Sequence, residues 1–152
     1  RAYGREMAPL TELRAGEGDE AYLYHGWYWP EAPGGTRLRW ARRVASLVGA
    51  LPAGAAALHW ELVPAPAAGD VTIAIRVQRR EDDHWAEAGV LTIALPAGTG
   101  AVSLATPCDL EAGEYRLILA ADAAPVERGY FPRQISFGLA GLRVAPRREG
   151  GV

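Results

Sequence analysis

The chain has 152 residues, of which 49% are hydrophobic and 22% are charged, and its formal net charge is -2. This length suits one domain that can fold without a disulfide or a metal, and the composition excludes a wholly disordered chain. The small negative charge argues against a nucleic-acid partner, because domains that bind nucleic acid usually present a basic face. No apolar run approaches the ~20 residues that a membrane-spanning helix needs, so we expect no membrane insertion.

All 16 basic residues are arginine, and the sequence contains neither lysine nor asparagine. Both absences fit a high-GC genome, because Lys and Asn codons are AT-rich, and the lack of Asn excludes N-glycosylation. The single cysteine, Cys108, excludes a disulfide within the chain. We expect Cys108 to be a small filler residue beside a turn, not a catalytic thiol.

The two ends of the chain differ in character from its middle. Residues 1–20 are charged and contain glycine without periodicity, which predicts a linker or a loosely attached arm. Residues 146–152 are similar and are expected to form a C-terminal tail. A β-sandwich domain would then occupy residues 21–145. Linker-like ends, with Arg1 as the first residue, are expected of a domain cut from a larger protein.

Between these ends apolar residues recur at every second position, as in strands with one buried face. In residues 71–78, for example, Val71, Ile73 and Ile75 alternate with Thr72 and other polar or small residues. Turn signals rich in Pro and Gly separate such runs, which predicts an all-β sandwich or barrel of about 8–9 strands. We favour an antiparallel two-sheet sandwich, although a short helix competes over residues 37–51. The predicted strands cover residues 36–41, 44–48, 55–63, 71–78, 90–95, 101–106, 114–121 and 135–144.

Residues 22–40 form the most distinctive segment, because they contain six aromatic residues. Sugars present apolar C–H faces that pack on indole and phenol rings, while neighbouring charged side chains bind their hydroxyl groups. The alternative is a structural role, since Trp and Tyr each bury roughly 150–250 Å² in protein cores. Alternation along a strand would place some of these rings in the core. The six residues are Tyr22, Tyr24, Trp27, Tyr28, Trp29 and Trp40.

Residues 26–31 (GWYWPE), followed by Arg39 and Trp40, match a GW-x-x-x-E … RW pattern. Towards the C-terminus, residues 130–132 (YFP) and 138–144 (GLAGLRV) extend the match. These segments resemble β-sandwich domains that are appended to bacterial cell-surface polysaccharide and glycosyltransferase proteins. The resemblance covers roughly residues 22–144 and implies a jelly-roll-like, non-catalytic accessory domain. It favours the cell envelope or the extracellular space, although the sequence itself carries no localisation signal.

Residues 79–85 (RREDDHW) offer oxygen and nitrogen atoms that could bind a cation. Calcium, however, takes about 6–8 oxygen ligands in a specific wrap, and this run lacks the glycines of an EF-hand loop. We therefore predict a charged hairpin tip, with Trp85 packed on the sheet beneath it, and no metal. No G-x-S-x-G, P-loop, G-x-G-x-x-G or H-E-x-x-H motif occurs, so we expect neither catalytic residues nor a cofactor.

The leading interpretation is a non-catalytic, carbohydrate-associated accessory or binding module of a larger protein, with a glycan or polysaccharide as its partner. The alternative is a structural or assembly domain that docks on other domains of the parent protein, or in a surface fibre or oligomer, by strand addition. A small β-barrel enzyme would require a deep pocket with two converging titratable groups. The predicted glycan contacts are Trp27, Trp29, Trp40, Trp85 and Tyr130 for stacking, and Glu31, Arg39 and Arg133 for hydrogen bonds.

Overall fold

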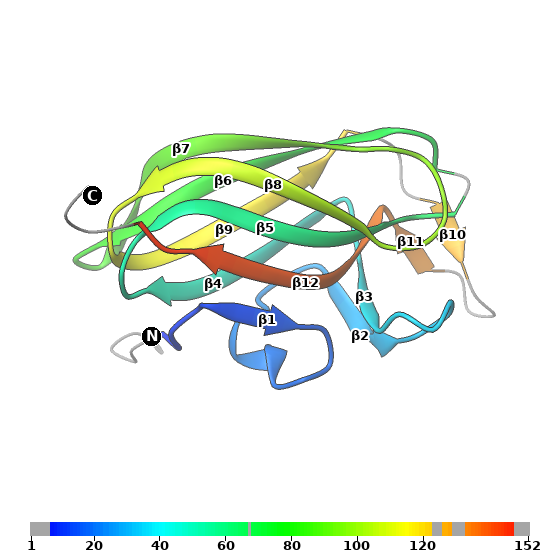
Figure 1. Cartoon of the computed structure of the whole chain (residues 1–152), viewed down its shortest axis with the longest axis horizontal. Coiled ribbons are helices and arrows are strands. Elements are labelled where there is room, and N and C mark those ends of the chain that lie inside the picture. Colours follow the sequence, from blue (N-terminus) through cyan, green and yellow to red (C-terminus); the bar gives the residue numbers. More distant parts are fainter. Residues whose placement is uncertain (1–6, 67, 123–125, 129–132, 148–152) are drawn as a thin grey trace.

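Two antiparallel sheets pack face to face in the computed structural model, which describes residues 7–66, 68–122, 126–128 and 133–147 (Figure 1). The six-stranded sheet has the order β2-β3-β12-β5-β8, with β1 also paired to β12, and the four-stranded sheet has the order β4-β9-β6-β7. A third pair, β10 with β11, forms a two-stranded ribbon. The two-sheet sandwich is therefore confirmed, and the strands missed by the sequence are the short ones. The elements are β1 (Glu12–Arg14), the 3-10 helix η1 (Asp19–Ala21), β2 (Trp27–Glu31), β3 (Leu38–Ala41), β4 (Val44–Leu51), β5 (Ala55–Pro64), β6 (Val71–Glu81), β7 (His84–Leu95), β8 (Val102–Leu110), β9 (Gly113–Ala121), β10 (Val126–Arg128), β11 (Arg133–Ile135) and β12 (Phe137–Ala145).

The chain crosses between the two sheets at most of its connections. Strands β3, β5, β8 and β12 belong to the six-stranded sheet, whereas β4, β6, β7 and β9 belong to the four-stranded sheet. This alternation is the topology of a jelly roll. One crossing depends on Gly54, because its φ is 72° and a Cβ there would collide with the Leu110 carbonyl oxygen. Strands β3 and β4 occupy residues 38–41 and 44–51, so the helical alternative for residues 37–51 is wrong.

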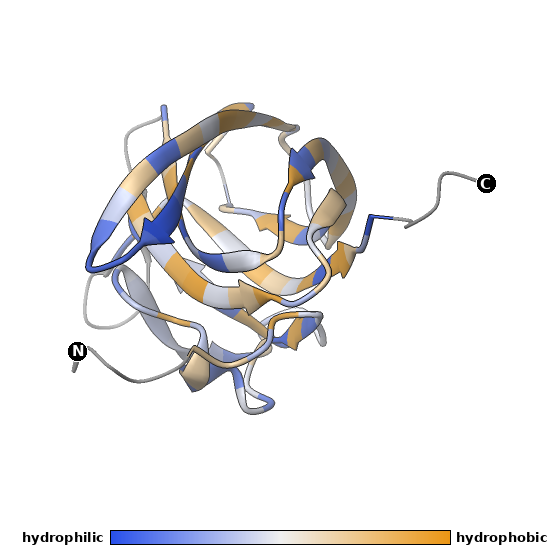
Figure 2. Ribbon diagram, turned by 90° about the vertical axis from the view of Figure 1, so that its left-hand side faces the viewer, coloured by the Kyte–Doolittle hydropathy of each residue, from blue (hydrophilic) through white to orange (hydrophobic). Residues whose placement is uncertain are grey.

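The hydrophobic core lies between the two sheets. Alternate residues of β6, such as Ile73 and Ile75, point into the core, as do Leu117 and Leu119 of the neighbouring strand β9. Figure 2 looks along the sandwich and shows hydrophobic and hydrophilic residues alternating on its strands. Each large apolar side chain that is buried in this way contributes about 1.5–3 kcal/mol. Among the described residues no helix is long and apolar enough to cross a membrane.

The N-terminal segment is an integral part of the sandwich. Strand β1 pairs with β12, and the Leu10 amide donates to the Ala50 carbonyl oxygen of β4 at 2.7 Å. Leu10 and Leu13 are buried in the main core. The prediction of a loosely attached arm over residues 1–20 is therefore wrong for residues 7–20. A strand of three residues is too short to show a period in the sequence. The expected tail, residues 146–152, lies outside the described part from residue 148 onwards.

Candidate functional site

Trp27 joins the two sheets and is only half exposed. Its indole Nε1 donates a hydrogen bond to the Ser46 carbonyl oxygen on β4 at 2.8 Å. Its ring meets Phe137 edge-on, with centroids 6.2 Å apart and an interplanar angle of 90°. Both contacts lie on the inner side of β2, where the ring packs against the main core. The structure thus gives Trp27 a packing role instead of the exposed stacking role that the sequence predicted.

Trp40 is 3% exposed, so the prediction that it contacts a ligand is wrong. It packs in a second, smaller core with Leu38 and Ile135, and Tyr28 packs against the same cluster. The Trp40 ring lies across Gly138, where an added Cβ would come within 3.1 Å of the ring. Several residues of this cluster, such as Val63, Ile135 and Ala140, lie far from Trp40 in the sequence, which is why alternation alone could not show its burial.

Arg39 is also buried, and its guanidinium group is engaged by protein atoms. It forms an ion pair with Asp19, with Nε and Oδ2 2.7 Å apart. Nη1 donates to the Tyr28 carbonyl oxygen at 3.1 Å. The predicted role of Arg39 in binding sugar hydroxyl groups is therefore wrong, because its donors hold the N-terminal segment and β2.

Two aromatic residues of this segment are exposed, Tyr24 at 57% and Trp29 at 63%, and Trp29 is the one that lies on β2. Its ring meets Tyr28 edge-on at a centroid distance of 6.1 Å, and the Arg42 guanidinium carbon lies 5.5 Å from the Tyr28 ring centroid. The Tyr28 hydroxyl donates to the Gln134 carbonyl oxygen at 3.3 Å. Glu31 is half-buried at the end of the same strand. We call Tyr28, Trp29 and Arg42 the aromatic edge, since β2 is an edge strand of its sheet.

The remaining predicted contacts do not join the aromatic edge within the described part of the chain. Trp85 lies on β7 of the other sheet, with the Arg116 guanidinium carbon 4.9 Å from its ring centroid. Arg116 is held in turn by Gln78, whose Oε1 accepts from Nε at 2.7 Å. Tyr130 and the side chain of Arg133 lie outside the described residues.

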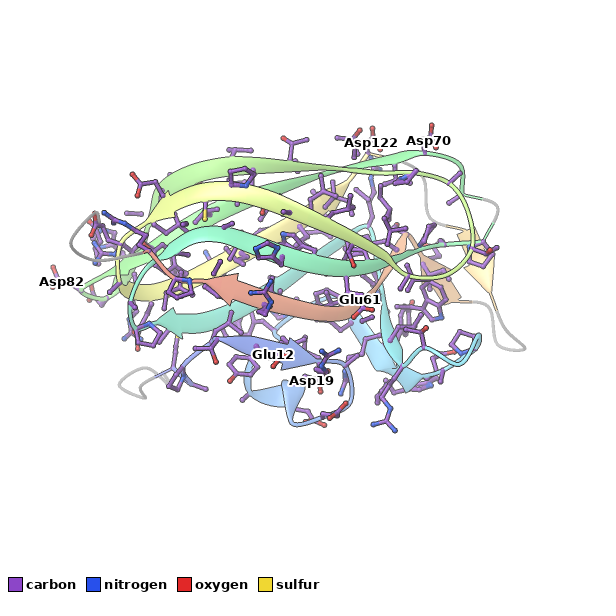
Figure 3. All side chains as sticks on the ribbon, in the orientation of Figure 1. Glu12, Asp19, Glu61, Asp70, Asp82 and Asp122 are labelled. Carbon is purple, nitrogen blue, oxygen red and sulfur yellow. The ribbon has the colours of Figure 1, made fainter. Side chains whose placement is uncertain are left out.

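The outer face of the six-stranded sheet carries a groove of about 430 Å³ over β1, β12, β5 and β8. Figure 3 labels Glu12 and Glu61 on this face. Strand register places the outward side chains in two rows that run across the strands, each taking one residue from every strand. The first row is Glu12, Arg143, His59 and Ala105, and the second is Arg14, Gly141, Glu61 and Ser103.

Small residues within these rows keep the groove open. Gly141 lies in the middle of the second row, and an added Cβ would lie 3.2 Å from the Leu13 carbonyl oxygen and 3.5 Å from Glu61 Oε1. Ala105 on β8 is the last residue of the first row, and its side chain is only a methyl group. Longer side chains flank these positions, so the hollow forms where side-chain volume is missing from the sheet surface.

Charges are distributed unevenly in the groove. Arg14 lies between two carboxylates, with Nη2 3.2 Å from Glu12 Oε2 and Nη1 3.7 Å from Glu61 Oε1. Arg143 makes no ion pair with any described residue, and its neighbour on β5 is His59. Two carboxylates and two guanidinium groups leave the groove without net charge, but both carboxylates are paired with Arg14 and neither is paired with Arg143.

The sequence predicted part of this groove without recognising it. Alternation in residues 55–63 put His59 and Glu61 on the face opposite Trp60, which is where the structure has them. Glu12 and Arg14 lie in the segment that was predicted to be a loosely attached arm, so their position beside Glu61 could not be predicted. A row across four strands depends on strand order and register, and neither leaves a signal in local spacing.

No cluster of three or more His, Cys, Asp or Glu residues that could hold a metal occurs within the described ranges. Residues 81–84 form the tip of the β6–β7 hairpin, where Glu81 pairs with His84. Cys108 is half-buried on β8, and burial raises the pKa of its thiol, with a smaller contribution from the Asp109 carboxylate. A raised pKa keeps the thiol protonated at neutral pH, which disfavours a nucleophilic role.

No protein-family model and no curated protein matches the sequence, but several solved structures share its fold. CsCBM6-3 from Clostridium stercorarium, solved in complex with cellobiose, has a TM-score of 0.53 at 12% identity over 95% of this chain and 99% of its own. The carbohydrate binding module CBM6cm-2 from Cellvibrio mixtus lichenase 5A, in complex with cellotriose, has a TM-score of 0.53 at 17% identity over 92% and 99%. A glycoside hydrolase family 43 arabinoxylan arabinofuranohydrolase from Bacillus subtilis, in complex with cellotetraose, has a TM-score of 0.55 at 14% identity, and the match covers 94% of this chain but 28% of that enzyme. The chain therefore shares its β-sandwich fold with carbohydrate-binding modules and with part of a glycoside hydrolase.

Proposed function

We propose that this chain is a non-catalytic carbohydrate-binding module of a larger protein, and that the groove on the six-stranded sheet is its binding site. The observation that carries the proposal is the pair of cross-strand rows, which present carboxylate, guanidinium, imidazole and hydroxyl groups in one hollow. Such groups donate and accept the hydrogen bonds that the hydroxyl groups of a sugar require. The fold supports the proposal, because CsCBM6-3 and CBM6cm-2, which the chain matches over nearly their whole lengths, were solved with cellobiose and cellotriose.

Two carboxylates in one groove also invite comparison with a glycosidase, which needs a pair of acidic residues. The side chains of Glu12 and Glu61 are 52% and 39% exposed, so water reaches both. A catalytic site gains much of its power from excluding water, and this groove lies open on a sheet surface. We therefore assign Glu12 and Glu61 to ligand binding, with no bond cleavage.

The aromatic edge extends the same proposal to a stacking contact. Trp29 lies on β2, which is separated from β12 by β3 alone, so about 10 Å of sheet separates the two strands. A ligand chain that leaves the groove towards β2 could stack a sugar ring on the Trp29 indole. Glu31 on the same strand and Arg42 beside Tyr28 would bind hydroxyl groups there.

Affinity electrophoresis and titration calorimetry against a panel of soluble polysaccharides and oligosaccharides test the proposal. We expect at least one glycan to bind, and Glu61→Gln and His59→Ala to weaken that binding. Arg76→Gln is the control, because Arg76 lies on the outer face of the other sheet. Trp29→Ala reports separately on the aromatic edge. Absence of glycan binding, or binding that all groove variants retain, would overturn the proposal.

The alternative function, a structural or assembly domain, is favoured by a different surface. Val44 and Val90 are 52% and 64% exposed on strands β4 and β7, at the two edges of the four-stranded sheet. Because these two valines lie at opposite edges, they form no joint apolar patch, and self-assembly would depend on strand addition at an edge such as that of β7. Light scattering and size-exclusion chromatography test this alternative: a strict monomer over a wide concentration range would argue against self-assembly.

A further inference from the structure

We propose that the groove selects an anionic saccharide, one that carries a carboxylate beside free hydroxyl groups. This inference rests on the proposed function, because it names the chemical class of the glycan that the same groove would bind.

Both carboxylates of the groove form ion pairs with the guanidinium group of Arg14. Arg14 contacts Glu12 at 3.2 Å and Glu61 at 3.7 Å, so one guanidinium group serves both acids. A cationic ligand would have to compete with Arg14 for these oxygens. The acidic side of the groove therefore offers hydrogen-bond acceptors to hydroxyl groups, and Arg14 compensates one of its two negative charges.

Arg143 is the arginine of the groove whose guanidinium group is not held by a carboxylate of the described residues. No ion pair joins it to any residue that the structure describes, although it lies between β1 and β5 in the first row. Its neighbour on β5 is His59, and its neighbour on β1 is Glu12, whose Oε2 is held by Arg14. A guanidinium group offers five N–H donors in a planar fork that matches a carboxylate through two parallel bonds.

The surroundings of Arg143 leave room for an anionic group. Beyond His59 the first row ends in Ala105, which lines the groove with a methyl group only. In the second row Gly141 has no side chain to fill the groove. Its neighbour on β5 is Glu61, and the neighbour of Glu61 on β8 is Ser103. A carboxylate at Arg143 would thus place the neighbouring hydroxyl groups of the sugar near Glu61 and Ser103.

Among the described residues that line the groove, no Trp, Tyr or Phe side chain faces outward, and the imidazole of His59 is the outward ring. Trp60 lies on β5 between His59 and Glu61, below the groove. Its ring is buried in the core, and its Nε1 donates to Thr106 Oγ1 at 3.0 Å. Without an outward Trp, Tyr or Phe ring, polar contacts must supply most of the affinity within the groove. Because hydrogen bonds between charged partners are about twice as strong as neutral ones, a charged ligand gains more here than a neutral one.

The experiment compares trigalacturonate with its carboxyl-reduced form, which has the same linkage and ring but no charge. Titration calorimetry of the full chain at low salt is expected to show at least about tenfold tighter binding of the acid, the equivalent of one charge-assisted pair. Added salt should weaken the binding of the acid and leave the neutral sugar unchanged, because ions screen exposed charges. A sulfated oligosaccharide of the same length tests whether the anionic group is sulfate.

Two arginine variants make the test specific. Arg143→Gln is expected to remove the preference for trigalacturonate, and Arg76→Gln on the opposite sheet to retain it. Circular dichroism confirms that each variant is folded. Tighter binding of the sulfated sugar that also depends on Arg143 would support an anionic ligand with sulfate as its group. Equal affinities for the acid and its reduced form, with Arg143→Gln changing neither, would overturn the inference and leave glycan binding intact. Absence of binding to all three sugars and to the wider panel would overturn the proposed function itself.

Discussion

The guanidinium group of Arg39 holds the carboxylate of Asp19 through two bonds, from Nε to Oδ2 at 2.7 Å and from Nη2 to Oδ1 at 3.0 Å. Asp19 is 1% exposed, and its Oδ2 also accepts from the Gly16 amide at 3.0 Å. The same guanidinium binds the Tyr28 carbonyl oxygen. This ion pair therefore joins the N-terminal segment, β3 and the strand that carries the aromatic edge.

Breaking this pair from one side should destabilise the protein strongly. Asp19→Ala leaves the buried Arg39 guanidinium without its partner, and we expect the free energy of unfolding to fall by about 3–5 kcal/mol. Urea denaturation followed by tryptophan fluorescence measures the change. The double variant Asp19→Leu with Arg39→Met removes both charges, so its loss should be smaller.

The control for the ion pair is Arg76→Gln, which breaks an exposed pair between Arg76 and Glu87. Solvent screens such pairs, so we expect almost no change in the urea midpoint. If Asp19→Ala shifted the midpoint no further than this control, the buried pair would not be a source of stability.

Substitution of the buried Trp60 should lower the free energy of unfolding. Trp60→Phe removes the Nε1 donor to Thr106 Oγ1 and leaves a gap in the core, and we expect a loss of about 1–3 kcal/mol in the free energy of unfolding. Chemical denaturation again provides the measurement. Trp29→Phe changes the same residue type on the exposed surface and should have little effect. Equal losses for the two variants would contradict the burial that separates them.

Filling the groove should abolish ligand binding while the fold is retained. Ala105→Leu adds a side chain at the open end of the first row, on an exposed position of β8. We expect glycan retention in affinity gels to fall at least about tenfold, because the added volume occupies the space of the ligand. Ala74→Leu makes the same change on the outer face of the other sheet and should retain binding. Normal binding by Ala105→Leu would place the ligand elsewhere.

Cys108 should react slowly with thiol reagents in the folded protein. Burial raises the pKa of this thiol in the fold, so the thiolate, which is the reactive form, becomes abundant only at a higher pH than in the unfolded chain. The rate of reaction with a chromogenic disulfide, measured from pH 7 to 10 with and without urea, should show this displacement. Because the folded pKa is the higher one, stability is present below the unfolded pKa and declines as the pH rises through the folded value. Identical pH profiles for both states would contradict a raised pKa.

Local alternation was sufficient to predict the longer strands and their buried faces. Ile73 and Ile75 on β6, and Leu117 and Leu119 on β9, point inward as their alternation predicted. Side chains alternate between the two faces of any strand, so a local pattern is enough to identify the apolar face. The class of the fold followed from the repetition of that pattern with turns between the runs.

Which residues share a surface depends on the packing of the whole fold and not on local spacing. Trp29 and Trp40 are the same residue type in one short segment, yet Trp40 is covered by Ile135 and Tyr28 while Trp29 is exposed. Glu12 reaches the groove because β1 pairs with β12, and β12 pairs with the strand that carries Glu61. Strand order and register arise from the packing of the whole core, so the pairing that assembles both surfaces is a property of the folded chain and not of any local pattern.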